Sequence, residues 1–335
     1  MRTIKILTTI LMISFIAWGQ SKVGSTAMPF LTIGVGPKAI GMGGAFTATA
    51  NDVTGIFWNP AGVSRMESSQ AMFTHSKWFA DINFNWAGAA INLGNMGTIG
   101  ASFMYLDYGK MEVTNMREQE GTGEFFEAKD LAIALHYSYN LTDRFSVGGN
   151  VKYVRQSIWH SSASTVAFDL GILFISEIDG LRIGATISNF GPDAKMDGKD
   201  LLFQHDADGQ QYGNNDQVLG YWKTDEFPLP FTFKVGLAYD PIKLEDHKLT
   251  IAADVNYPND NSSSVNVGAE YTFMNLLSIR AGYKSLFLDN ADESFTYGVG
   301  LIQEVGRNSY LTFDYSFTKM NKLDNTHQFS VGIRF

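Results

Sequence analysis

The six histidines and the dispersed carboxylates are the residues of this chain whose chemistry could support catalysis or metal binding. The histidines lie far apart, at His75, His136, His160, His205, His247 and His327. No two have the i, i+4 spacing that places two imidazoles on one zinc ion, and no Gly-x-Ser-x-Gly segment presents a serine nucleophile. The chain has no cysteine, which excludes disulfides, zinc–thiolate sites and thiol nucleophiles. We therefore predict a protein that is not an enzyme and that uses no metal and no cofactor.

Three motifs near the N-terminus could be mistaken for ligand-binding signatures. Residues 34–39 have the Gly-x-Gly-x-x-Ala spacing of a dinucleotide fingerprint, but they lack the preceding strand and the βαβ frame which that fingerprint needs. Residues 41–44 are not followed by Lys-Ser/Thr, so they do not form a phosphate-binding P-loop. Residues 59–61, Asn-Pro-Ala, match a tripeptide of water channels, which require helical spans that we do not expect here. None of the three predicts a ligand.

Charged side chains in the second half of the chain fall on one face of alternating segments. In residues 249–257, for example, apolar side chains alternate with Thr250, Ala252, Asp254 and Asn256. Since successive side chains of a strand point to opposite faces of the sheet, the charges share one side. We expect them to form ion pairs across neighbouring strands rather than a pair of catalytic acids. The residues of this set are Lys234, Asp254, Glu270, Arg280, Asp314 and Arg334.

Alternation with a period of two continues through almost the whole chain after residue 69. The segments between Gln70 and Phe335 are roughly ten residues long, close to the 9–11 that a tilted strand needs to cross a bilayer. After the first residues, no apolar run approaches the length of a helical span. We predict an all-β fold, with residues 70–335 forming a transmembrane antiparallel β-barrel of about 14 strands whose apolar side chains face lipid.

The connections between these segments alternate between short and long. Outer-membrane barrels have short periplasmic turns and longer outer loops, whereas a soluble β-protein, the alternative fold, has no reason for such alternation. The short connections are expected at residues 93–97, 140–144, 177–180, 241–247, 273–276 and 304–308. The long ones are expected at residues 109–127, 156–162, 189–227, 258–263, 286–293 and 319–325.

The first 19 residues have the features of a secretory signal peptide. Arg2 and Lys5 precede a short apolar run at residues 6–16, and residues 17–19 supply small side chains at a cleavage pattern. We expect cleavage near Gln20 and export to the outer membrane of a Gram-negative cell. The formal net charge of -9 at pH 7 argues against nucleic-acid binding, which requires a basic patch or stripe.

Residues 20–69 differ from the barrel segments because they are rich in Gly, Ala and Thr. Asn59-Pro60 indicates a turn, and Gly62 is available for a positive φ. A barrel of the predicted strand number is wider than the kind that side chains alone can fill, so we predict a compact plug or lining in the lumen. The structural motif of this plug comprises Gly41, Gly43, Gly44, Asn59, Pro60 and Gly62.

The sequence of this segment resembles a known family. GPKAIGMGGAFTATANDVTGIFWNPAG, residues 36–62, is similar to the N-terminal signature of the PorV/PorQ family of FadL-type outer-membrane barrels, and GSTAMPFL, residues 24–31, fits the same signature. The resemblance implies a 14-stranded barrel tied to the type IX secretion system, in which PorV-like members bind the translocon and pass cargo to a cell-surface attachment complex. It does not separate PorV from PorQ and assigns no cargo-binding residue.

The chain ends on an alternating segment, HQFSVGIRF, residues 327–335. We expect this strand to close the barrel against the first one, with its end in the aromatic belt at the periplasmic rim. The pattern resembles the C-terminal signal that barrel assembly machinery recognises, although an ordinary edge strand is the alternative. The apolar positions of the signal are Phe329, Val331, Ile333 and Phe335.

Two functions remain open from the sequence. The first is an accessory or cargo-handling role in type IX protein secretion, with the translocon and secreted proteins as partners beside outer-membrane lipid. The second is a FadL-like diffusion channel for hydrophobic small molecules, which predicts an apolar pocket leading from the outer loops and can include a lateral gap. The acidic loop at residues 189–227 is interpreted as a solvated cap, a calcium site without EF-hand spacing or a partner-docking lid, with Trp159 and Trp222 as candidate contacts.

Overall fold

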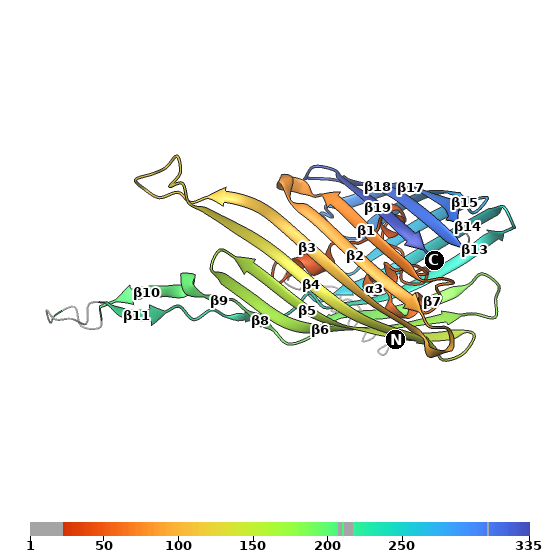
Figure 1. Cartoon of the computed structure of the whole chain (residues 1–335), viewed down its shortest axis with the longest axis horizontal. Helices are drawn as coiled ribbons and strands as arrows, with labels where there is room; N and C mark the ends of the chain where they lie inside the picture. The colour runs from red at the N-terminus through yellow and green to blue at the C-terminus, as the bar shows by residue number, and fades with distance from the viewer. Residues whose placement is uncertain (1–22, 207–209, 211–216, 307) are drawn as a thin grey trace, which may run out of the picture.

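The computed structural model describes residues 23–206, 210, 217–306 and 308–335. The predicted signal peptide and the expected cleavage position lie outside the described residues. A closed antiparallel β-barrel surrounds a short N-terminal segment, and a long arm extends from one end of the barrel (Figure 1). Among the described residues, no helix is long and apolar enough to cross a membrane.

Fourteen strands form the wall of the barrel, as predicted. Each pairs antiparallel with both neighbours, and the last strand, β19, pairs with the first, β1, which closes the barrel. The strands are β1 (Gln70–Lys77), β2 (Asn83–Asn92), β3 (Thr98–Glu112), β4 (Phe125–Asn140), β5 (Phe145–Ile158), β6 (Ser161–Ile175), β7 (Arg182–Phe190), β13 (Thr232–Lys243), β14 (His247–Pro258), β15 (Ser264–Phe273), β16 (Leu277–Leu286), β17 (Glu293–Gly306), β18 (Ser309–Met320) and β19 (Thr326–Arg334).

The two faces of these strands are chemically distinct. On β16, the Ile279 side chain is 54% exposed on the outside of the barrel, while the neighbouring Arg280 is 4% exposed inside it. The outer face therefore suits hydrocarbon, and the closed ladder pairs the backbone groups that lipid could not satisfy. The Phe335 amide donates to the Ser69 carbonyl at 2.9 Å, so the chain end is bonded beside the start of β1.

One predicted long loop is wrong. Only Trp159 and His160 connect β5 to β6, and the strand pairing continues to Ile158 opposite Ser161. We predicted a loop because residues 156–162 are mostly polar. Where the strands extend beyond the lipid, however, both faces of the wall meet water, and polar side chains are then compatible with a strand. The loop expected at residues 109–127 is likewise shorter, since β3 and β4 pair as far as Glu112 and Phe125.

The long connection between β7 and β13 contains the arm, which has secondary structure of its own. Figure 1 shows β10 and β11 as a hairpin projecting far beyond the wall. Its elements are β8 (Ala194–Lys195), β9 (Asp197–Gly198), η4 (Lys199–Leu201), β10 (Leu202–His205), β11 (Val218–Tyr221) and β12 (Glu226–Phe227). Long connections lie on the outer side of such barrels. We therefore call the end of the barrel that carries the arm the outer end.

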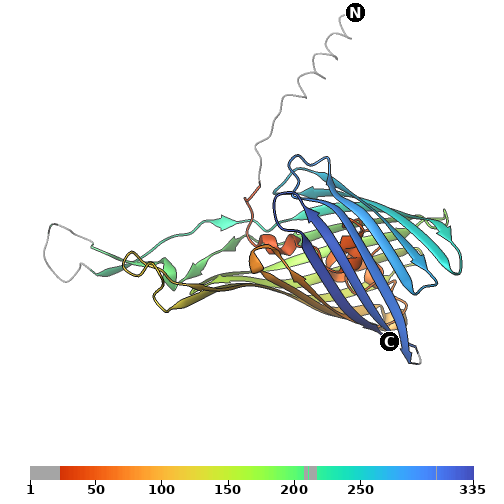
Figure 2. The same ribbon diagram turned by 90° about the horizontal axis from the view of Figure 1, so that it is seen from above.

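The N-terminal segment lies inside the barrel, where Figure 2 shows its short helices surrounded by the wall. Its helices are η1 (Pro29–Thr32), α2 (Pro37–Gly41), α3 (Gly55–Trp58) and α4 (Pro60–Val63). Two single-turn elements, η2 (Phe79–Asp81) and η3 (Gly94–Met96), lie between the first wall strands. Most residues from Met28 to Val63 are buried, and they form about half of the apolar core. The core of this protein is therefore the contact between the plug and the inner face of the wall.

Leu135→Arg tests the assignment of the outer face to lipid. Leu135 on β4 is 66% exposed, and a basic side chain at mid-depth on a lipid face costs about 2–4 kcal/mol. The free energy of unfolding in lipid vesicles, measured by urea titration, should fall by that amount. The control is Leu141→Arg in the turn after β4, which is 55% exposed and should change stability by less than about 0.5 kcal/mol. Equal losses in the two variants would contradict the assignment.

Candidate functional site

The plug crosses the lumen from one end to the other. Near the outer end, the Ala27 amide donates to the Pro228 carbonyl at 2.9 Å and the Thr26 hydroxyl to Asp260 at 3.0 Å. At the opposite end, the Arg65 guanidinium donates to the Asp143 carbonyl at 2.7 Å, in the turn between β4 and β5. The segment is thus tied to the wall at both mouths of the barrel.

A buried carboxylate of the wall holds the middle of the plug. Oδ2 of Asp254 on β14, which is fully buried, accepts the backbone N–H groups of Phe46 and Thr47, both at 2.9 Å. Hydrogen bonds to an ionised acceptor are roughly twice as strong as neutral ones. On β17, the Thr296 hydroxyl accepts the Gly43 N–H at 3.0 Å and donates to the Gly41 carbonyl at 3.2 Å. The wall therefore satisfies plug backbone groups that water cannot reach.

Glycines at inward positions of the wall let the plug backbone approach the strands directly. A Cβ added to Gly268 would lie 2.1 Å from the Met42 carbonyl oxygen, and one on Gly282 would lie 2.2 Å from the Gly43 nitrogen. Similar contacts would occur at Gly184 against Thr47. Only glycine permits such an approach. Sequence reasoning found the plug glycines and missed these wall glycines, whose signal was glycine recurring at inward positions of successive strands.

The predicted plug motif makes contacts that differ in part from expectation. Asn59 and Pro60 begin helix α4 rather than a free turn: the Asn59 side chain accepts the Ala61 N–H at 3.1 Å and donates to the Ile172 carbonyl of β6 at 3.0 Å. Gly62 does not adopt a positive φ, but a Cβ there would lie 1.9 Å from the Ala50 carbonyl oxygen. Gly43 and Gly44 have φ values of 67° and 74°, and Gly41 packs against Gly298 of the wall.

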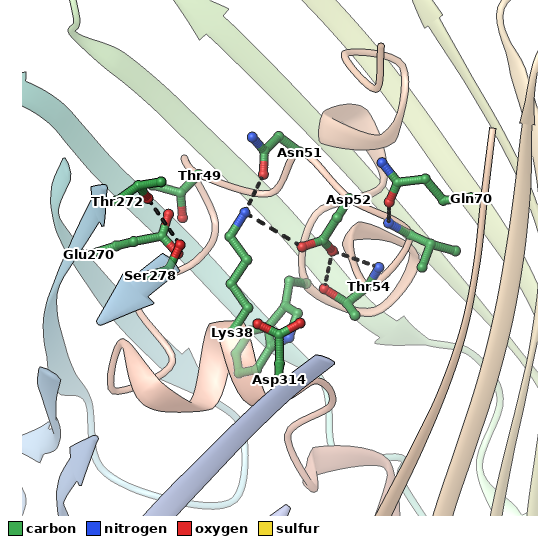
Figure 3. A network of polar contacts seen from close by, with 12 residues as sticks. Lys38, Thr49, Asn51, Asp52, Thr54, Gln70, Glu270, Thr272, Ser278 and Asp314 are labelled. Carbon is green, nitrogen blue, oxygen red and sulfur yellow. Dashed lines mark hydrogen bonds and ion pairs between the residues drawn. The ribbon is translucent and has the colours of Figure 1, made fainter. Parts of the chain in front are cut away.

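Two groups of charged side chains, one on the plug and one on the wall, face each other in the lumen (Figure 3). Arg280 of β16 bridges two strands, with Nε 2.5 Å from Glu270 Oε2 and Nη1 2.6 Å from Asp314 Oδ1. Lys38 of α2 donates to Asn51 at 2.8 Å and lies 3.7 Å from Asp52. Figure 3 shows the Lys38 side chain reaching from its helix past Asp314 toward this pair. Arg280 thus pairs within the wall and Lys38 pairs within the plug. Gln70 of β1 joins the two, because its Oε1 atom accepts the Val53 N–H of the plug at 3.3 Å.

The alternating pattern predicted that the six charged residues of the inner face form ion pairs across neighbouring strands. Only some of them do. Glu270, Arg280 and Asp314 form ion pairs, but Asp254 binds plug backbone and Lys234 lies over the Trp58 ring, 4.8 Å from its centroid. In the described part of the chain, no ion pair involves Arg334. The physical reason is the plug, which occupies the space between opposite walls and offers its own backbone and aromatic partners.

Two larger hollows exist in the described structure. A polar cavity of about 270 Å³ lies between plug and wall at the outer end, lined by residues that include Phe57, Lys152, Lys234 and Asn261. A second hollow, of about 780 Å³, is apolar and lies on the lipid-facing side of β1–β3, β18 and β19. Paired strands separate this second hollow from the lumen, so it is a surface depression.

The arm presents aromatic side chains to solvent. The Trp222 residue is 62% exposed and its ring lies 4.7 Å from that of Phe203. Trp159, which is 43% exposed, lies outside the arm in the turn between β5 and β6. The base of the arm is fixed, since Asp200 accepts the His160 N–H at 3.0 Å and the Ser161 hydroxyl at 3.1 Å. Most of the calcium-like stretch at residues 206–216 lies outside the described residues, and elsewhere in the described chain no cluster of acids or histidines could hold a metal ion.

Comparison with known proteins agrees with this architecture. The family described as "Type IX secretion system protein PorV" matches residues 17–204. The chain belongs to the PorV family. The match covers more than half of the sequence, including the whole plug, and confirms the family that the plug sequence resembled. A comparison with curated protein sequences finds no match.

Solved structures show that this PorV-family chain has the fold of FadL-type barrels. CymD, a monoaromatic hydrocarbon channel, has a TM-score of 0.59 at 13% identity, covering 90% of this chain and 97% of its own. The toluene transporter TbuX of Ralstonia pickettii has a TM-score of 0.58 at 13% identity, covering 90% and 98%. A FadL homologue of Pseudomonas aeruginosa has a TM-score of 0.55 at 12% identity, covering 90% and 98%. The fold places the protein in the outer membrane.

Gly268→Ala tests the close seat of the plug. The added methyl would overlap the Met42 carbonyl, and overpacking of this kind costs about 1–3 kcal/mol. Unfolding by urea in vesicles should show this loss. Gly306→Ala is the matched control, since a Cβ there meets nothing within 4 Å. A Gly268→Ala variant as stable as the control would show that the plug does not press on the wall.

Asp254→Ala tests the carboxylate anchor. Removing it leaves two buried N–H groups without an acceptor, which should cost on the order of 3 kcal/mol. We expect the loosened plug to allow ion conductance in planar bilayers that the wild-type barrel lacks. The control is Asp289→Ala, which removes a carboxylate from the exposed connection before β17 and should show no ion conductance. An Asp254→Ala variant with wild-type stability and no ion conductance would contradict the proposed role of this residue.

Proposed function

We propose that this PorV-family protein is an accessory, cargo-handling component of type IX secretion and neither an open pore nor an enzyme. The observation that carries the proposal is the seat of the plug, which is bonded to the wall at both ends of the lumen and in the middle. A barrel closed in this way does not offer a route through the membrane for a polypeptide. Its work is then expected at its surfaces.

The arm is the surface that best suits a protein partner. Leu219 and Trp222 are 69% and 62% exposed on a hairpin that stands away from the membrane. Exposed apolar and aromatic side chains of this kind are typical of protein interfaces, and tryptophan is enriched among the residues that dominate binding energy. We propose that the arm docks the translocon or a secreted protein, which favours the docking-lid interpretation of residues 189–227 over a solvated cap.

The second candidate function, diffusion of hydrophobic small molecules, is supported by the fold shared with hydrocarbon channels such as CymD and TbuX. Two features favour the secretion role instead. The outer cavity is lined by lysines, amides and hydroxyl groups as well as by Leu31, Phe57 and Trp58, so it is not the wholly apolar pocket that this function predicts. In addition, every described wall strand pairs with both of its neighbours, which is the pattern of a closed wall.

Targeting and assembly complete the proposal. Residues 1–19 would direct export as a cleaved signal peptide, residues 20–69 would fold as the plug, and residues 70–335 would form the barrel. Phe329, Val331 and Ile333 lie on the exposed face of β19, and Phe335, which follows the end of this strand, is also exposed. That strand would serve as the signal for the barrel assembly machinery, with Phe335 at the periplasmic rim.

The double substitution Leu219→Ser/Trp222→Ser tests the docking surface. In cells lacking the native gene, this variant should assemble as a heat-modifiable barrel but bind its partner about tenfold or more weakly in detergent pull-downs, because truncating interface anchors typically costs more than 1 kcal/mol. Export of surface proteins should fall accordingly.

The control for this test is Leu244→Ser, which changes an equally exposed leucine at the opposite end of the barrel. It should support normal export. Unchanged export after complete deletion of the gene, together with loss of hydrocarbon uptake, would overturn the secretion role and establish the diffusion channel.

A further inference from the structure

The outer cavity contains a lysine whose ammonium group has no hydrogen-bond acceptor among the described residues. The other two lysines of the cavity are neutralised: Lys152 lies 2.7 Å from Asp169, and Lys284 forms an ion pair with Glu293. Lys234 has neither a hydrogen bond nor an ion pair in the described chain, and its contact is the face of Trp58. Lys234 is only partly buried, so its ammonium group faces the cavity, where water or a ligand would supply the acceptor.

A free acceptor lies directly opposite this donor. Asn256 on β14 is the cross-strand partner of Lys234 on β13, and both side chains line the cavity. The Asn256 Oδ1 atom is buried and has no hydrogen-bond partner among the described residues. Directly paired residues of an antiparallel sheet have Cβ atoms about 4.5–5.5 Å apart, so a small molecule bound at Lys234 would lie beside Asn256. Its hydroxyl would meet Oδ1 through a rotation of the Asn256 side chain, because this atom is buried in the described structure.

The cavity is accessible from the outer side of the membrane. Asp260 and Asn261, in the connection between β14 and β15, line its mouth, while Phe57 and Trp58 of the plug form its floor. Its volume is about 270 Å³, enough for a small solute and not for a folded domain. Ser188, Thr232 and Ser264 add hydroxyl groups to its lining.

We propose that this cavity binds a small oxyanion that also carries a hydroxyl group, taken from the external medium. The negatively charged oxygen would accept from the Lys234 ammonium, and the hydroxyl would donate to Asn256 Oδ1. Phosphate in its protonated forms and α-hydroxy carboxylates share this chemistry, whereas a simple carboxylate supplies only the acceptor. This site is additional to the proposed secretion role and does not depend on it.

The test is titration calorimetry of the full-length protein, purified in detergent at low ionic strength, with inorganic phosphate, glycolate and acetate as probes. Phosphate and glycolate should bind saturably, and acetate about tenfold more weakly because it lacks the hydroxyl donor. Lys234→Met should weaken phosphate binding by at least about tenfold, since the lost hydrogen bond is charge-assisted. Asn256→Leu should remove the preference for glycolate over acetate and leave acetate binding unchanged.

Two further variants serve as a charge-matched control and as an independent block of the cavity. Lys322→Met removes the same charge from the exposed connection before β19 and should bind phosphate like the wild type. Asn261→Trp would cover the mouth of the cavity with Lys234 intact, and it should abolish binding even if Lys234→Met does not fold. Absence of saturable phosphate or glycolate binding by the wild type, or equal binding by wild type and Asn261→Trp, would overturn the proposal.

Discussion

The direct contact of two backbones, that of the plug and that of the barrel wall, is the constraint on which this structure depends. A closed barrel satisfies its own peptide groups, but a segment placed inside it brings further N–H and C=O groups that must also be paired. Asp254 and Thr296 provide the polar partners, and inward glycines such as Gly268 and Gly282 provide the space. Side chains at those positions would move the plug off the wall and leave its backbone groups without partners.

The barrel could be predicted from the sequence because its cause is local. The alternation of Ile279 and Arg280, repeated over strands long enough to span a bilayer, fixes which face meets lipid. The partners of the lumen charges could not be predicted in the same way. Whether Asp254 meets a lysine or a backbone amide depends on how the plug is threaded through the lumen, and alternation carries no information about that. The turn at Trp159 was missed because polar residues above the lipid level resemble a loop.

The fold is shared with hydrocarbon channels, but the two hollows described above do not join into an apolar route through the lumen. CymD and TbuX are named for hydrocarbon transport, and their likeness to this chain is one of fold. In the present barrel, the apolar hollow is a depression on the lipid side, and the cavity at the outer mouth is polar. The arm also carries exposed aromatic side chains, Tyr221 and Trp222 among them, beyond the end of the wall. The proposed secretion role rests on this arrangement, in which a plug bonded to the wall is combined with an exposed arm.

Hydrogen exchange of the plug amides, measured by mass spectrometry on the protein in lipid nanodiscs, tests the fixed plug most directly. If the wall holds the plug through Asp254 and Thr296, peptides covering Gly43, Phe46 and Thr47 will exchange as slowly as those of the wall strand β15. Exchange of these peptides at the rate of the exposed connection between β3 and β4 would show that the plug moves freely in the lumen, which would contradict a plug fixed by the wall.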